Sequence, residues 1–101
     1  MQKYVYLFHV GTPIDLSGDF EEKNTQWFAS LSKNLIDGGN PFNPKSEAKV
    51  SAGKVEKDPD SVAGYCIVNA ENLDEAVAMA KECPLAIMPG CAVKVYEKMA
   101  M

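Results

Sequence analysis

The sequence predicts an α+β domain in which strands and helices follow one another in the order β-α-β-β-α-β. Apolar residues alternate with polar ones in some segments and recur at three- and four-residue spacing in others, patterns typical of strands and helices respectively. With 101 residues, 47% of them hydrophobic, the chain is long enough for one core. We therefore expect a single domain over residues 1–101.

The first strand and the first helix are predicted near the N-terminus. Residues Tyr4 to Val10 are rich in aromatic and β-branched side chains and stop at Gly11-Thr12-Pro13, which predicts a strand followed by a loop. From Glu21 to Asp37 the apolar residues fall at helical spacing, and Gly38-Gly39 follows as a stop signal. This spacing predicts an amphipathic helix over 21–37.

The middle of the chain predicts a weak edge strand and then a strong central one. Residues 40–44 hold prolines and asparagines and are expected to turn, and Ala48 to Ala52 alternate weakly. Val62 to Ala70 is the strong strand, with the small residues Gly64 and Cys66 on one face. We expect that face to lie against the helices.

The last third of the chain predicts a helix and a final strand. Asn72 is a suitable N-cap with Glu75 three residues later, and Pro84 cannot continue the helix. Cys91 to Met99 alternate as the last strand. The resulting order is the split βαβ or ferredoxin-like arrangement, a four-stranded antiparallel sheet with two helices on one face.

Composition and charge exclude several classes of function. A net charge of -4 repels phosphate backbones, so we expect no nucleic-acid partner. No apolar run approaches membrane-spanning length and the N-terminus lacks a signal-peptide pattern, which predicts a cytoplasmic protein with no membrane partner. The 3 cysteines and 1 histidine form neither a zinc site nor a disulfide framework, and no phosphate loop is present. We expect no metal and no cofactor.

One face of the predicted sheet is crowded with aromatic side chains. Strand alternation is expected to turn Val5, Leu7 and His9 towards the helices and to collect the following side chains on the open face: Tyr4, Tyr6, Phe8, Tyr65, Ile67 and Tyr96. No helix of one copy covers that face, so we expect a homodimer that pairs two open sheet faces. A merely amphipathic face and an RNA-stacking surface are the alternatives.

Four segments carry a pattern known from a protein family. They are Gly64-Tyr65-Cys66-Ile67-Val68, Asn72-Leu73-Asp74-Glu75-Ala76, Ala80-Lys81-Glu82-Cys83-Pro84 and Val93-Lys94-Val95-Tyr96-Glu97. Together they resemble the YCII-related, or DGPF-motif, family over nearly the whole chain. The resemblance implies a dimeric α/β barrel, and some relatives in the wider superfamily isomerise or dehalogenate lactones or act as small oxygenases.

Two features depart from the family pattern. The motif that names the family should fall just before the third strand, where Lys57-Asp58-Pro59-Asp60 keeps an aspartate and a proline in a different order. In one branch a histidine on the first helix is the proposed catalytic base, and Trp27 stands at that position in this chain.

His9 is the candidate catalytic base, because it lies where the first strand ends and is expected to point into a cleft under the first helix. Asp58 or Asp60, on the loop that enters the third strand, would orient it, and Asp15 is a further possibility. A structural, hydrogen-bonded histidine is the alternative.

Trp27 and Asn40 are the candidate substrate-binding residues. Trp27 could wall the pocket against the sheet, with core packing as the alternative, and the turn over 38–41 would lie beside the pocket. Two functions are compatible with such a cleft. One is a small enzyme performing acid–base chemistry on a lactone or small organic acid, and the other is a non-catalytic small-molecule-binding or accessory dimer.

Overall fold

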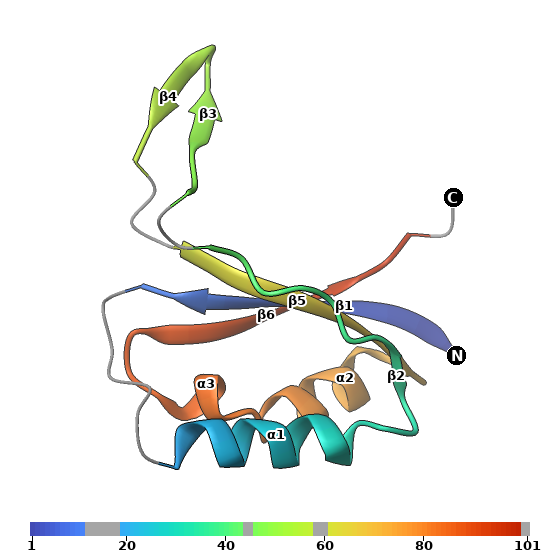
Figure 1. Ribbon diagram of the computed structural model, residues 1–101. Helices are drawn as coiled ribbons and strands as arrows, with labels where there is room; N and C mark the ends of the chain where they lie inside the picture. Colours follow the sequence, from blue (N-terminus) through green and yellow to red (C-terminus); the bar gives the residue numbers. More distant parts are fainter. Residues whose placement is uncertain (12–18, 44–45, 58–60, 100–101) are drawn as a thin grey trace.

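The computed structural model describes residues 1–11, 19–43, 46–57 and 61–99. Along this part of the chain the elements are β1 (Gln2–Val10), α1 (Phe20–Ser30), β2 (Leu35–Asp37), β3 (Lys49–Ser51), β4 (Lys54–Glu56), β5 (Ser61–Ala70), α2 (Leu73–Ala80), α3 (Pro84–Ile87) and β6 (Cys91–Glu97). The helices lie together on one side of the main sheet, and β3 and β4 stand apart from it (Figure 1). The molecule is an α+β protein, as the sequence predicts.

The main sheet has four strands in the order β2-β5-β1-β6, and every neighbouring pair is antiparallel. The central strands β1 and β5 pair from Gln2 opposite Ala70 to Val10 opposite Ser61. A register shift between Phe8 and His9 marks a bulge in this pairing. A four-stranded antiparallel sheet is therefore confirmed.

The edge strand β2 was not predicted. The helical spacing continues to Asp37, but α1 ends at Ser30 and the chain then runs along β5. The Asn34 side-chain amide donates to the Asn69 carbonyl at 2.9 Å, and the Asn69 backbone amide donates to the Asn34 carbonyl at 2.7 Å. These long-range bonds satisfy backbone groups at the open edge of β5, and they override the local preference for helix.

The segment predicted as the second strand of the main sheet forms a separate hairpin instead. β3 pairs only with β4 among the described strands, with Val50 opposite Val55. Ala52 and Gly53 have φ angles of 53° and 75°, the left-handed pair that a type I′ hairpin turn requires. The observed order is β-α-β-β-β-β-α-α-β, so the prediction lacked β2, β4 and α3 and assigned residues 48–52 to the wrong sheet.

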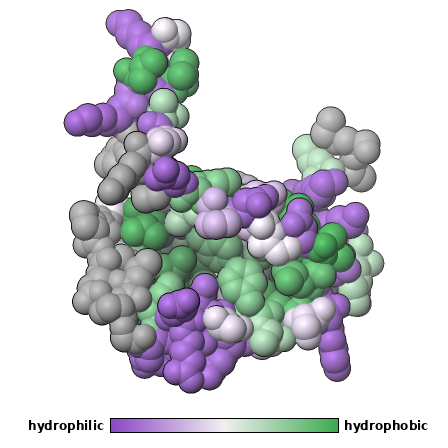
Figure 2. Space-filling view, in the orientation of Figure 1, coloured by the Kyte–Doolittle hydropathy of each residue, from purple (hydrophilic) through white to green (hydrophobic). Residues whose placement is uncertain are grey.

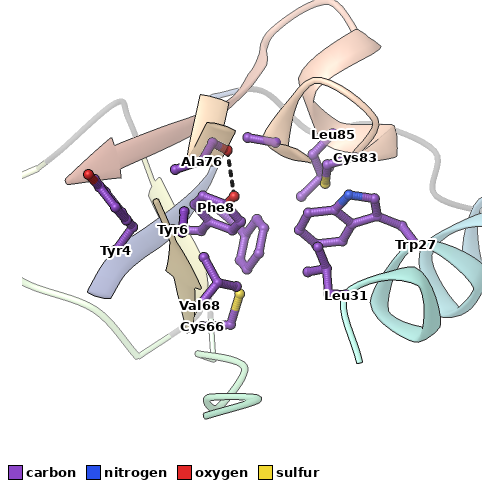
Figure 3. Packing of buried hydrophobic residues seen from close by; sticks show 12 residues of the cluster. Tyr4, Tyr6, Phe8, Trp27, Leu31, Cys66, Val68, Ala76, Cys83 and Leu85 are labelled. Atoms are coloured by element: carbon purple, nitrogen blue, oxygen red, sulfur yellow. Dashed lines mark hydrogen bonds between the residues drawn. The ribbon is translucent and has the colours of Figure 1, made fainter. Parts of the chain in front are cut away.

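The faces of β1 are the reverse of the prediction. Tyr4, Tyr6 and Phe8, expected on the open face, are 2%, 0% and 7% exposed and belong to the core beneath the helices. The Tyr6 hydroxyl donates to the Ala76 carbonyl at 2.5 Å (Figure 3). The centroids of the Tyr6 and Trp27 rings are 6.0 Å apart. The assignment of these three aromatic residues to an open dimer interface is therefore wrong.

Volume explains the reversal, because both faces of β1 are apolar and alternation alone does not distinguish them. Helix α2 presents Ala76 and Ala80 to the sheet, and such small side chains leave room for large rings. Across the strands Tyr6 lies opposite Cys66 and Val95, and both of these were predicted on the helix side. The predicted faces of β5 and β6 are confirmed: Cys66 is fully buried, and Val95 packs against the core.

The helix over 73–80 begins as predicted. The Asn72 side chain accepts a hydrogen bond from the Glu75 amide at 2.9 Å, so this residue is the N-cap of α2. Pro84 follows this helix and opens α3, a short helix that buries Leu85. No helix was predicted between Pro84 and the last strand.

Candidate functional site

A cavity of 370 Å³ lies between α1, the end of β1, the beginning of β5 and the segment 38–41. Its apolar side is lined by Phe8, Val10, Phe20, Phe28 and Leu85. Its other side is lined by Asn24, Asn40, Pro41, Ala63, Gly64 and Tyr65, together with Gly38. Figure 2, in the orientation of Figure 1, shows apolar surface between α1 and the sheet. The volume is in the range of about 300 to 1,000 Å³ that small-ligand sites occupy.

Aromatic rings make the apolar wall of the cavity rigid. The rings of Phe8 on β1 and Phe28 on α1 have centroids 6.1 Å apart. Behind them, the Trp27 ring meets Phe8 edge to face at 5.9 Å and Phe28 at 5.0 Å. Because each ring limits the movement of the next, the wall offers a fixed surface on which a flat molecule can stack.

The polar side chains that line the cavity are the amides of Asn24 and Asn40, and the Tyr65 ring lies on the open face at the rim of the cavity. The Asn40 side-chain amide donates to the Tyr65 hydroxyl at 3.2 Å, and Asn24 is half-buried on α1. An asparagine side chain offers both a donor and an acceptor, so these groups could bind a carbonyl or a hydroxyl group. The lining residues that the structure describes carry no side chain that is charged at neutral pH.

The segment 38–41 is held close to β5 because glycines stand at two points of contact. Gly39 has a φ of 73°, and a Cβ at this position would lie 1.6 Å from the Tyr65 carbonyl oxygen. A Cβ on Gly64 would lie 2.9 Å from the Asn40 carbonyl oxygen. The Gly39 amide also donates to the Asp37 carboxylate at 2.8 Å. Both glycines are therefore needed to hold Asn40 at the cavity.

Of the two predicted substrate-binding residues, only Asn40 lines this cavity. Trp27 is 4% exposed and lies behind the cavity wall, where its indole N–H donates to the Met79 carbonyl at 2.9 Å. Its outer edge borders a separate hollow between α1 and α3. Trp27 therefore packs in the core, which was the alternative interpretation of this residue.

His9 lies on the opposite side of β1 from the cavity. Phe8 and Val10 both line the cavity, so alternation along the strand directs the residue between them to the other face. The His9 side chain is 5% exposed, and the residues opposite it on the neighbouring strands are Val62 and Ala92. The expectation that His9 points into the cleft under α1 is therefore wrong.

The predicted acidic partners of His9 are Asp58 and Asp60, with Asp15 as a further possibility. All three lie outside the residues that the structure describes. The role of His9 as a general base stays a prediction. A catalytic site that uses His9 would lie on the open-face side of the sheet.

Three of the six side chains predicted on the open face of the sheet lie there. Tyr65 lies opposite Leu7, and Ile67 and Tyr96 both lie opposite Val5, so these five side chains share one face. Tyr96 is 51% exposed, and the other four are half-buried. These five side chains are largely apolar, as predicted, but those from β1 are aliphatic instead of aromatic, and Lys94 lies on the same face opposite Leu7.

The phenylalanines of the cavity wall were not identified from the sequence. Phe28 follows Trp27 directly, and adjacent side chains on a helix point about 100° apart around its axis. This difference in direction could have indicated that one of the two rings lies at the edge of the core, where it can line a cavity. Phe20 precedes the predicted helix, and no sequence pattern pointed to its role.

The described residues include no candidate metal site and no candidate membrane-spanning helix. Within the described ranges, no three side chains of the His, Cys, Asp and Glu types gather where they could hold a metal ion. In the same part of the chain, no helix combines the length and apolar character needed to cross a membrane.

No model of a known protein family matches the sequence, and no curated protein shows significant similarity to it.

Proposed function

We propose that the protein binds a small, neutral, largely aromatic molecule in the cavity under α1, and that it does so as a homodimer of the YCII-related type. The observation that carries this proposal is the cavity itself, with its phenylalanine wall and the amide groups of Asn24 and Asn40. A mostly apolar hollow with a few placed polar groups is the usual form of a small-molecule site.

The lining of the cavity favours a neutral ligand. Moving a carboxylate out of water is costly unless a positive partner replaces its hydration, and the described lining residues supply none. A lactone, an ester or a similar carbonyl compound needs only a hydrogen-bond donor, which Asn24 or Asn40 can provide. Of the two predicted ligand classes, lactone and organic acid, the cavity therefore favours the lactone.

Binding without catalysis is the function that this geometry favours. A general base must come within hydrogen-bonding reach of the proton that it removes. The described lining residues include no histidine, carboxylate or lysine. The alternative enzyme, with His9 as base and Asp58 or Asp60 as partner, would have to work from the other face of the sheet. A buried imidazole at the end of a rigid strand supports that alternative.

The apolar open face supports the homodimer. Its five members Val5, Leu7, Tyr65, Ile67 and Tyr96 would expose at most about 500 Å² of apolar area, at about 100 Å² each, and apolar patches of about 300 to 600 Å² are often functional surfaces. Two such sheets packed face to face would make the dimeric α/β barrel that the family resemblance implies. With the β3–β4 hairpin set aside, the antiparallel sheet with helices on one side supports the ferredoxin-like assignment.

Fluorescence of Trp27, the chain's 1 tryptophan, tests the binding proposal, because its ring contacts both Phe8 and Phe28. A neutral aromatic lactone should change the emission in a saturable way, and the matching ring-opened hydroxy acid should bind at least about tenfold more weakly. Phe28→Ala should weaken binding, whereas Val50→Ala, far from the cavity, should not. Absence of saturable binding across a panel of neutral aromatic carbonyl compounds would overturn the proposal.

The enzyme alternative has a separate test. His9→Asn should abolish any lactone turnover that the native chain shows while leaving lactone binding in the cavity unchanged. Turnover that survives this substitution would exclude His9 as the base.

A further inference from the structure

We infer that the β3–β4 hairpin is a dimerisation arm that packs against a second copy of this chain. The inference rests on the proposed pairing of two open sheet faces and adds to it an element that contacts the partner. Three observations support it: the exposed apolar pair on the hairpin, its position beside the open face, and the area that a stable dimer requires.

The hairpin is well formed but has little to hold it in one copy. Val50 and Val55 lie directly opposite each other and are 69% and 75% exposed. Figure 2 shows apolar side chains between hydrophilic ones on this projecting element. A two-stranded hairpin alone in water is only marginally stable, so an exposed apolar pair at its centre calls for a covering surface.

The hairpin also stands where a second copy would reach it. It rises from one end of the sheet on the side away from the helices (Figure 1), which is the side of the open face. At its base a hollow of 940 Å³ is lined by Phe42, Val55 and Val62. The rings of Phe42 and Tyr65 have centroids 6.0 Å apart, so apolar surface continues from the open face into this hollow.

The area of the open face alone is small for a stable dimer. A stable interface buries about 800 Å² on each partner, whereas the five side chains of the open face supply at most about 500 Å². The exposed side chains of Val50 and Val55 on the hairpin would add to the area that each copy buries. Lys49, Lys54 and Glu56 on the hairpin carry charges of both signs, as expected for the rim around an apolar contact.

The test is sedimentation equilibrium of the full-length chain with three variants. Val50→Lys combined with Val55→Lys removes the apolar pair of the arm, and both side chains are too exposed for this change to unfold one copy. Tyr96→Lys disrupts the open face instead. Ile87→Lys is the matched control, because Ile87 is 73% exposed on α3, in the helix layer.

We expect the arm variant to raise the dimer dissociation constant at least about 100-fold and the control variant to leave it unchanged. If the arm variant dimerises like the native chain while Tyr96→Lys does not, the arm inference fails and the open-face dimer stands. If only the arm variant dissociates, the arm is the interface and the open-face proposal fails. A native chain that stays monomeric at all concentrations overturns both.

Hydrogen exchange of residues 48–57 provides an independent readout. The arm amides should gain protection as the protein concentration passes the dimer dissociation constant, while the amides of α3 should not change. Arm protection that is independent of concentration would contradict the inference.

Discussion

The central pair of strands β1–β5 and the hairpin β3–β4 have the same antiparallel hydrogen-bonding pattern but opposite surroundings. Tyr6, Cys66 and Val68 in the central pair are fully buried, whereas Val50 and Val55 in the hairpin are mostly exposed. Strand pairing by itself therefore does not determine stability in this protein. The central pair is fixed by packing under the helices, and the hairpin is fixed by the chemistry of its turn.

The largest loss of stability is expected when the most buried ring of the central pair, that of Tyr6, is removed. Tyr6→Ala should lower the free energy of unfolding by about 3 to 5 kcal/mol, because it leaves a cavity among Trp27 and Ala76. Val50→Ala in the hairpin should change it by less than about 0.5 kcal/mol. Urea unfolding at concentrations where the chain is monomeric measures both, and equal losses would contradict the contrast.

A smaller change isolates one hydrogen bond of the core. Tyr6→Phe keeps the ring but removes the hydroxyl that donates to the Ala76 carbonyl, and it should cost about 1 to 2 kcal/mol. Tyr96→Phe is the matched control, since Tyr96 is 51% exposed and its hydroxyl can bond to water. A native-like stability of Tyr6→Phe would show that this buried bond contributes little.

The buried thiols of Cys66 and Cys83 make the stability of the core depend on pH. Burial raises the pKa of Cys66 to about 12 and raises the pKa of Cys83 as well. Because these folded-state pKa values lie above that of an unfolded thiol, about 8.5, the stability from burying neutral thiols is complete below pH 8.5 and is lost as the pH rises towards 12. Unfolding followed from pH 7 to 10 should show this decline.

Reactivity towards a thiol reagent gives a second measure of the same effect. Cys91 is half-buried, and burial raises its pKa too. It should react first in the folded protein at pH 8, with Cys66 and Cys83 at least about tenfold slower. Faster reaction at Cys66 would show that the core under α2 opens readily.

The smallest expected effect on global stability comes from the turn of the hairpin. Ala52→Asn creates the Asn-Gly pair that type I′ turns prefer, because Ala52 holds a φ of 53°. It should raise the hairpin population, seen in the chemical shifts of residues 49–56, and change global unfolding by less than about 0.5 kcal/mol. Gly53→Ala should lower the hairpin population. If either variant shifted the whole unfolding transition, the hairpin would not be independent of the core.

The sequence predicted the fold best where only one arrangement could satisfy the packing. Strand β5 has small residues on one face, so its helix side could be recognised, and the Asn72 cap marked the start of α2. Strand β1 is apolar on both faces, and the choice between them depends on the space left by Ala76 and Ala80, far along the chain. Edge strand β2 followed from hydrogen bonds to Asn69, which no local pattern reveals.

The candidate site was predicted only in part for the same reasons. Asn40 and the segment 38–41 lie at the cavity as expected, because glycines at positions 39 and 64 let the segment after β2 run close to β5. The reversal of β1 moved His9 to the other face and brought Phe8 to the cavity. Trp27 and Phe28 are adjacent in α1, and only the three-dimensional packing decides which ring enters the core.

The most direct test of the proposed function is to locate a bound ligand by intermolecular NOEs. For a neutral aromatic lactone that shows saturable binding, we predict contacts to the ring of Phe28 and to the methyl groups of Val10 and Leu85, which line the cavity. Contacts to Ile67 on the open face, with none to Phe28, would contradict the proposed site.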